Sequence, residues 1–385
     1  MGDNRGIMIT LGFGLDKKGH FGIDNTSVGL APAAPAATPG KDWQVPNDGH
    51  HDAAVLAISA VGSAGVGMLI RGLRKQPVLT VKDVALDAAV GLQLGTCMVG
   101  TPQAESVCYG ALGGLPLQVI NRMRDPKWDF RVGLLTTGAL SLARSEIGGN
   151  PVPYAGYRQG PNGPQLNAPQ LVANATVDIG ADSAFYALSN TTAALLQGYS
   201  LKRLPGVALS GAAYGGSQSL LDNVVLGAPL KLSASMKSGA VAIDKNSGGP
   251  DISGLMRFTT FRAGGVLQKL MGGATITLGR NVSIQGFDIN DTTVAHEMVH
   301  RTQMAASASS GRNGTGLLSF YGQYLSWAPK GYENIPYERE AYHYADGKAT
   351  TPYAEGKQIG DFLTAPFALG MFTLPAVLMP PPVAE

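Results

Sequence analysis

Two histidines and a glutamate stand close together near residue 300, in the order His296-Glu297-Met298-Val299-His300. Residues four apart lie on the same face of an α-helix, so His296 and His300 can reach one metal ion. Glu297 lies one step round the helix, where its carboxylate can act as a general base on water. Imidazole nitrogens are common zinc ligands. The spacing therefore predicts a zinc site built for hydrolysis, with two of its ligands on one helix.

The residues before this helix predict two short strands, at 274–278 and 281–285, separated by Gly279-Arg280. Both segments are rich in Thr, Ile and Val and are bounded by turn residues. An extended peptide can pair with the edge of a sheet. A strand pair that leads into the metal helix is therefore suited to hold a peptide substrate.

A catalytic zinc site needs a third protein ligand and one position for water. The candidates are carboxylates in residues 334–344, where Pro336 suits the first turn of a helix. Glu338 and Glu340 are two residues apart and face different sides of that helix, so only one of them is expected to meet the zinc. On this reasoning either can be the ligand.

Other side chains in the same segment could assist the reaction by donating a hydrogen bond to the oxyanion of a tetrahedral intermediate. His343 is either such a donor or an ordinary surface histidine. Three tyrosines compete for the same role: Tyr337, Tyr342 and Tyr344. The alternative to a metal site is that both helices are solvated and carry their histidines and carboxylates on exposed faces.

H-E-x-x-H followed a few dozen residues later by Asn334-Ile-Pro-Tyr-Glu338-Arg-Glu-Ala341 resembles the N-P-x-E-x-x-A pattern of gluzincin-type zinc peptidases. More narrowly, residues 256–350 resemble metallopeptidase domains at the C-terminal end of bacterial polymorphic toxins and secreted effectors. Thr275-Ile-Thr-Leu-Gly279 before the metal helix, Gln303 after it and the Tyr-rich link Tyr321 to Tyr332 match features of those relatives. The resemblance implies that Glu338, three residues before Ala341, is the third ligand.

The chain departs from the family at two places. Ile335 separates Asn334 from Pro336, and Tyr342 stands where many gluzincins have an Asp that orients a zinc-ligating histidine. Asp346 or Asp288 could replace that Asp, or the residues behind the ligands differ.

The resemblance and the motif together predict an α+β fold. Its catalytic part would be a small zincin-like domain made of a strand pair, the H-E-x-x-H helix and the Glu helix. We expect it at residues 256–385, with an apolar C-terminal tail at 362–379. Before it we expect a Gly/Pro/Ala-rich segment and linker at 1–50, a small-residue-rich helical region at 51–149, and a loop with further apolar segments at 150–255.

The composition excludes some classes of function. The net charge is +2 and 15% of the residues are charged, which gives no basic surface for nucleic acid. The chain contains 52 glycines, about twice the usual share, which favours close helix packing or membrane contact. Cys97 and Cys108 lack metal-ligand spacing, and in a chain whose N-terminus shows no secretory signal they are expected to be buried free thiols.

Residues 53–70 contain no charged side chain and precede Arg71. They form either a buried helical hairpin or a membrane-inserting segment, because the length suits a minimal span but the residues are mostly Ala, Gly, Ser and Val.

The leading hypothesis is a zinc-dependent peptidase of the toxin or effector kind that acts on a protein or peptide. The resemblance implies further partners, an immunity protein or a secretion carrier, and export by a specialised secretion system. The alternatives are a membrane-active or pore-forming effector, and a protein in which zinc only stabilises the fold.

Overall fold

The computed structural model describes residues 7–15, 21–30, 49–73, 80–148, 151–161, 163–233, 237, 252–271, 274–284, 291–305, 316–327, 329, 332 and 335–346. The chain has mixed helices and strands with helices predominating, which confirms the predicted α+β class. The predicted tail at 362–379 and the linker at 31–48 lie outside the described residues.

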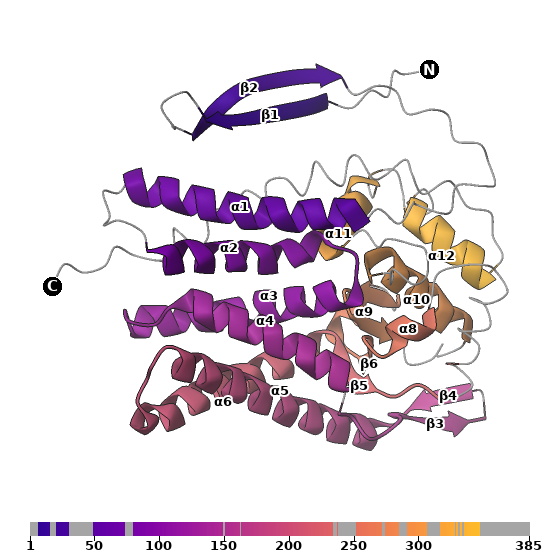
Figure 1. Cartoon of the computed structure of the whole chain (residues 1–385). Coiled ribbons are helices and arrows are strands. Elements are labelled where there is room, and N and C mark those ends of the chain that lie inside the picture. Colours follow the sequence, from indigo (N-terminus) through magenta and orange to yellow (C-terminus); the bar gives the residue numbers. More distant parts are fainter. Residues whose placement is uncertain are drawn as a thin grey trace.

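Long helices form the first part of the structure and lie side by side as antiparallel hairpins (Figure 1). Those before residue 149 confirm the helical region predicted at 51–149, and the two later ones lie in the segment predicted to be loop and further apolar segments. Their bounds are α1 Gly49–Leu73, α2 Val81–Gly95, α3 Pro102–Arg124, α4 Phe130–Ile147, α5 Ala168–Leu196 and α6 Leu204–Val225. We refer to these helices together as the helical bundle.

Local sequence explains where several of these helices begin. The side chains of Thr80 and Thr101 accept hydrogen bonds from the backbone N–H groups of Asp83 and Ala104, and so satisfy donors that have no partner inside the helix. Pro102 follows Thr101 in the first turn, where its missing N–H is not needed.

The high glycine content is explained by close helix packing. A Cβ at Gly211 of α6 would lie 2.3 Å from the carbonyl oxygen of Tyr186 on α5. A Cβ at Gly91 of α2 would lie 2.3 Å from the carbonyl oxygen of Ser59 on α1. The backbones of these pairs therefore touch, which larger residues would prevent.

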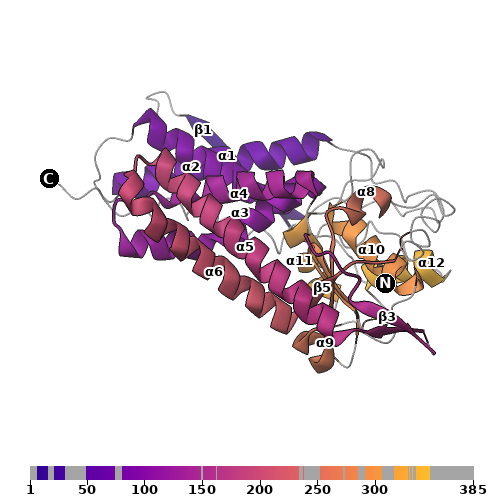
Figure 2. The same cartoon turned by 90° about the horizontal axis from the view of Figure 1, so that it is seen from below.

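A four-stranded sheet adjoins one end of the helical bundle (Figure 2). Its order is β5 (Gly227–Leu230), β6 (Thr260–Gly264), β8 (Asn281–Ile284) and β7 (Ile276–Leu278). β6 and β8 are parallel, and the other neighbours are antiparallel. The predicted strand pair before the metal helix is confirmed as β7 and β8.

Two further hairpins correct the sequence analysis. β3 (Tyr157–Gly160) and β4 (Gly163–Leu166) pair within 150–255, where a loop and apolar segments but no strand were predicted. β1 (Ile7–Leu15) and β2 (Phe21–Leu30) pair within the Gly-rich N-terminal segment, where no strand was expected. Alternation of glycine with apolar residues obscured the strand pattern in the second case.

The remaining α-helices of the described part lie between residues 252 and 346. They are the short α8 (Ile252–Met256) and α9 (Val266–Leu270), and the longer α10 (Asp291–Ala305), α11 (Leu317–Trp327) and α12 (Pro336–Asp346). α10 contains the H-E-x-x-H motif and packs against α12, the predicted Glu helix.

The main hydrophobic core joins this part to the helical bundle. Cys97 and Cys108 belong to the same core cluster as Met298 and Phe320. The domain boundary at residue 256 remains a prediction, and the core shows that the segments on its two sides share one interior.

Cys97 and Cys108 form a disulfide, so the expectation of free thiols is wrong. Cys97 lies in the short 3-10 helix η1 (Thr96–Met98) and Cys108 lies in α3, which turns back beside it. The chain reverses direction between them, which a pattern of spacing alone did not reveal.

Candidate metal centre

The H-E-x-x-H helix is buried. Val294, Met298 and Val299 are fully enclosed in the core, while His296 is 9% exposed and His300 is 4% exposed. The alternative in which this helix is a solvated surface element is therefore wrong. The two imidazole rings lie one turn apart with their centroids 4.9 Å from each other.

Glu338 of α12 faces both histidines. Its Oε2 lies 3.2 Å from Nε2 of His296, and its Oε1 lies 3.4 Å from Nε2 of His300. One ligand atom from each of the three residues lies within 4.8 Å of the other two. Ligand atoms at about 2.0–2.2 Å from a tetrahedral zinc ion are roughly 3.3 Å apart, so the two measured separations fit that donor set.

A second layer of side chains orients His300. Its Nδ1 lies 2.8 Å from Oε1 of Gln303, and Nε2 of Gln303 donates to Glu340 Oε2 over 2.9 Å and to the carbonyl oxygen of Tyr337 over 3.0 Å. An amide that donates to Glu340 must present its oxygen to His300, so Nδ1 keeps its proton and Nε2 is the nitrogen that can bind a metal once the ring is neutral.

Glu340 thus lies behind the site and not in it. Its side chain is 1% exposed and points toward Gln303, whereas Glu338 points toward the histidines. The alternative of two surface carboxylates on this helix is wrong, because both are buried.

Two tyrosines position Glu338. Tyr324 of α11 donates a hydrogen bond to its Oε1 over 2.8 Å, and Tyr332 donates one to its Oε2. The link from Tyr321 to Tyr332 is recognisably Tyr-rich in the sequence, but its pattern assigns no role to Tyr324 or Tyr332. No local pattern indicates which tyrosine of such a link reaches the carboxylate.

Glu297, the expected base, is anchored by the neighbouring strand. The hydroxyl of Thr277 on β7 donates to Glu297 Oε2 over 2.5 Å. Tyr321 holds the turn that follows β7, because its hydroxyl donates to the carbonyl oxygen of Thr277 and accepts from the N–H of Gly279. From the bundle side, Tyr109 of α3 donates to the carbonyl oxygen of Leu278 over 3.0 Å.

Arg301 follows His300 directly and ties α10 to α3. Its guanidinium donates to both carboxylate oxygens of Glu105 over 2.6 and 2.7 Å, and it also donates to Thr259. The side chain of Arg301 is fully buried. No motif in the sequence marks Arg301 or Glu105, and only the fold brings them together.

The remaining candidates have different positions. Tyr337 is buried in the core and its hydroxyl donates to Gln323, so it does not face the site. The ring of Tyr342 packs edge-on against His296, with the centroids 4.6 Å apart. The side chains of His343, Tyr344 and Asp346 lie outside the described residues, as does residue 288.

The charges of the cluster reinforce one another. Burial opposes protonation of His300, but the Glu338 carboxylate, Glu297 and Gln303 outweigh it and raise the pKa of His300 to about 9. Burial also opposes ionisation of Glu338, yet the two histidines and Tyr332 hold the pKa of that carboxyl well below its usual range. Burial and the Glu338 charge raise the pKa of Tyr324 and Tyr332, so both remain donors. The arrangement therefore keeps the Glu338 carboxylate ionised between the two imidazole rings.

No protein-family model, no curated protein and no solved structure matches this chain.

Proposed function

We propose that the chain is a zinc-dependent peptidase with a zincin-like catalytic part. The observation that carries the proposal is the convergence of His296, His300 and Glu338, three donors of the kind that hold catalytic zinc. The orientation of His300 by Gln303 and of Glu338 by Tyr324 and Tyr332 is what such a ligand set requires behind it.

When bound, zinc would polarise the carbonyl group of the peptide bond and make water acidic enough to be deprotonated near neutral pH. Glu297 takes the proton from the attacking water and delivers it to the nitrogen of the leaving amine. Thr277 donates to Oε2 of Glu297, which orients the carboxylate and leaves Oε1 for the proton.

The strand next to the base supports a peptide as the substrate. β7 is the edge strand of the sheet, and an extended peptide can add to such an edge. Thr277 belongs to β7, so a peptide that runs along this strand lies beside Glu297. The Tyr321 hydroxyl already binds the carbonyl oxygen of Thr277. A peptide would therefore pair with the residues that precede Thr277 in the chain.

The test compares purified wild-type protein with Glu297→Gln and His300→Ala by metal analysis and by hydrolysis of casein and a peptide library. We expect about one zinc per chain in the wild type and in Glu297→Gln, with hydrolysis by Glu297→Gln lower by about 10² to 10⁴. His300→Ala should lose the metal. Zinc without hydrolysis in the wild type would instead support a structural metal, and full activity in Glu297→Gln would exclude this mechanism.

A specific feature of the helical bundle favours a second function, association with a lipid bilayer. None of the exposed residues that the structure describes on α1, α5 and α6 is charged, and many are large and apolar. The charges of these helices point inward and mostly form pairs, such as Arg71 with Asp87 over 2.8 Å and Asp182 with Arg144 over 2.5 Å. Water-soluble helices usually show the opposite polarity.

The dimensions and the helix ends agree with this proposal. Asp52–Leu73 in α1 is the one helix in the described part that is long and apolar enough to cross a membrane. α5 has 29 residues and α6 has 22, which correspond to about 43 and 33 Å against a hydrocarbon thickness of about 30 Å. Lys202 and Arg203 are exposed at the turn between α5 and α6, where lipid phosphates would lie.

Membrane association is tested by flotation with phosphatidylglycerol-containing vesicles and by dye release from them. We expect wild-type protein to float with the vesicles. Leu209→Glu and Leu221→Glu, which place charges on exposed positions of α6, should abolish flotation while zinc content stays unchanged. Flotation without dye release would indicate a membrane-associated peptidase, and dye release would favour pore formation. If the wild type stays with the soluble fraction, the bilayer proposal is wrong.

A further inference from the structure

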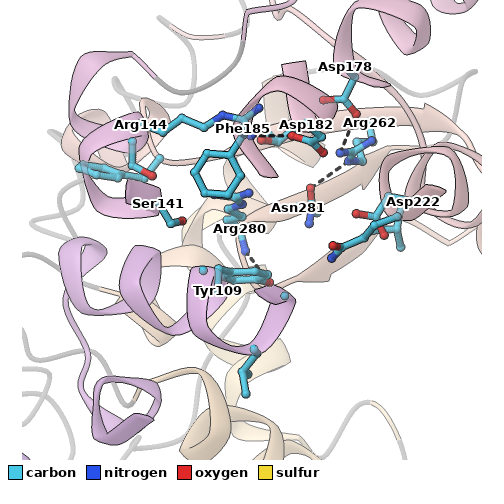
Figure 3. Close-up of a pocket in the computed structure, with 18 of the residues that line it drawn as sticks. Tyr109, Ser141, Arg144, Asp178, Asp182, Phe185, Asp222, Arg262, Arg280 and Asn281 are labelled. Atoms are coloured by element: carbon cyan, nitrogen blue, oxygen red, sulfur yellow. Dashed lines mark hydrogen bonds and ion pairs between the residues drawn. The ribbon is translucent and has the colours of Figure 1, made fainter. Parts of the chain in front are cut away.

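A polar cavity of about 330 Å³ lies between the helical bundle and the sheet, and none of the three candidate metal ligands lines it (Figure 3). Its walls come from α3, α4, α5 and α6 on one side, and from β6 and the turn between β7 and β8 on the other. Cavities of this size are at the lower end of those that bind small molecules, which cover about 300–1,000 Å³.

Most charged groups of the cavity already have partners. Arg262 pairs with Asp178 over 3.2 Å and also donates to Asn281 over 2.9 Å. Arg144 pairs with Asp182 over 2.5 Å. Within each pair the two charges neutralise each other. These pairs form part of the wall, so they are not the groups that would select a ligand.

Two opposite charges remain. The guanidinium of Arg280 lies over the ring of Tyr109, 5.1 Å from its centroid, and forms no ion pair within the described part of the chain. The carboxylate of Asp222 on α6 likewise has no partner among the described residues. Figure 3 shows the two side chains apart, one on the strand turn and the other on the helix. Burial raises the pKa of Asp222, and the charge of Arg280 is among those that lower it.

A buried acceptor stands beside the carboxylate. Gln218 lies four residues before Asp222 on α6, so both side chains project from the same face of the helix. Oε1 of Gln218 is buried and accepts no hydrogen bond from any residue that the structure describes. Buried polar atoms without partners are uncommon in folded proteins, and a cavity lined by them is expected to receive a ligand or ordered water that completes them.

We propose that this cavity binds a small zwitterion of the size of an amino acid or dipeptide, with its carboxylate on Arg280 and its ammonium group on Asp222 and Gln218. A ligand with a single charge would leave either the cation or the carboxylate of the cavity unpaired. Tyr109 holds the guanidinium in place before binding, because the cation stacks over its ring. The proposal rests on the groups of the cavity and not on the assignment of the metal centre.

The experiment measures binding of alanyl-alanine to the full chain by isothermal titration calorimetry, in a chelator so that the metal centre neither binds nor hydrolyses the probe. N-acetyl-alanyl-alanine lacks the ammonium group, and alanyl-alanine amide lacks the carboxylate. We expect each blocked form to bind at least tenfold more weakly than the free dipeptide. Free alanine and inorganic phosphate complete the series.

Variants assign each end of the ligand. In Arg280→Gln the free dipeptide and its amide should bind equally, and in Asp222→Asn the free and acetylated forms should bind equally. Arg158→Gln removes one exposed cation that does not line the cavity and should bind as the wild type does. Circular dichroism checks that each variant folds, and if a cavity variant does not fold, the blocked probes with wild-type protein decide alone. The proposal is overturned if neither alanine nor the dipeptide binds at millimolar concentration, if blocking either end changes nothing, or if phosphate binds as tightly as the dipeptide.

Discussion

Gln303 and His300 are joined by a contact of 2.8 Å between the amide oxygen and Nδ1, one turn along the same helix. Because the amide nitrogen of Gln303 donates to Glu340, the amide oxygen of Gln303 must face His300. The imidazole is therefore fixed with Nε2 toward Glu338. A residue outside the ligand set thus decides which nitrogen of the ring is free.

Replacing Gln303 with Leu should weaken zinc binding without removing a ligand. Loss of a residue that orients a metal-binding histidine commonly reduces affinity or activity by about 10- to 100-fold. Zinc affinity measured in competition with a chelator should fall by this amount. Gln159→Leu changes an exposed glutamine on β3 and should have no effect. Equal affinity in the two variants would show that Gln303 does not orient His300.

The two glutamates of α12 offer a matched pair. Glu338→Gln removes a charged ligand and should lower zinc affinity by tens-fold or more. Glu340→Gln retains an oxygen that can accept from Gln303, so zinc affinity should stay within a few-fold of the wild type. Chelator titration of both variants checks the order. The reverse order would transfer the third ligand to Glu340.

Zinc affinity should depend on pH through His300. The pKa of His300 in the metal-free protein is raised from 6.5 to about 9, so zinc must displace a proton from the ring in this interval. Apparent affinity should rise from pH 6.5 to pH 9, by at most about tenfold per pH unit for this one proton. Calorimetry in buffers of different ionisation enthalpy measures the proton released.

The same shift predicts the stability of the metal-free protein. The raised pKa means that the protonated ring stabilises the fold fully below pH 6.5, and that this contribution is lost as the pH rises toward about 9. The free energy of unfolding, measured with urea in the presence of a chelator, should therefore contain a contribution from His300 that decreases between pH 6.5 and about pH 9. With zinc bound, His300 stays neutral and the decrease should disappear. If the stability still decreases over this pH interval after zinc is added, His300 does not bind the metal.

Breaking the ion pair between Glu105 and Arg301 should destabilise the protein strongly. Removal of one partner leaves a buried charge without compensation, which costs about 3–5 kcal/mol. Glu105→Gln should thus show a lower free energy of unfolding in urea. The double variant Glu105→Gln with Arg301→Met removes both charges and should recover part of that loss. If Glu105→Gln is as stable as the wild type, the pair does not hold α10 to α3.

The sequence predicted the parts of the site that depend on local spacing. His296, Glu297 and His300 are fixed by helical geometry, and the strand turn at Gly279 and Arg280 by turn chemistry. The long helices of the bundle follow from apolar runs in which proline stands in the first turn, at Pro102, Pro169 and Pro205, apart from Pro116 inside α3.

The parts that the sequence did not reveal depend on contacts between distant segments. The disulfide between Cys97 and Cys108 requires η1 to turn back along α3, and neither cysteine has a neighbour that marks it for pairing. Tyr324 looks like an ordinary helix residue until the fold places it against Glu338, and the match at residues 275–279 did not indicate that Thr277 would bind Glu297.

The contact between Glu105 and Arg301 also has a consequence for how the protein is made. The carboxylate leaves the ribosome 196 residues before the guanidinium that neutralises it, so the metal helix can dock only late in synthesis. A C-terminal fragment released by proteolysis would carry His296 and His300 but would leave Arg301 without its counter-charge. Cleavage in the middle of the chain would therefore not liberate a self-sufficient metal-binding domain, and the candidate metal centre would persist only while the two pieces stay bound to each other.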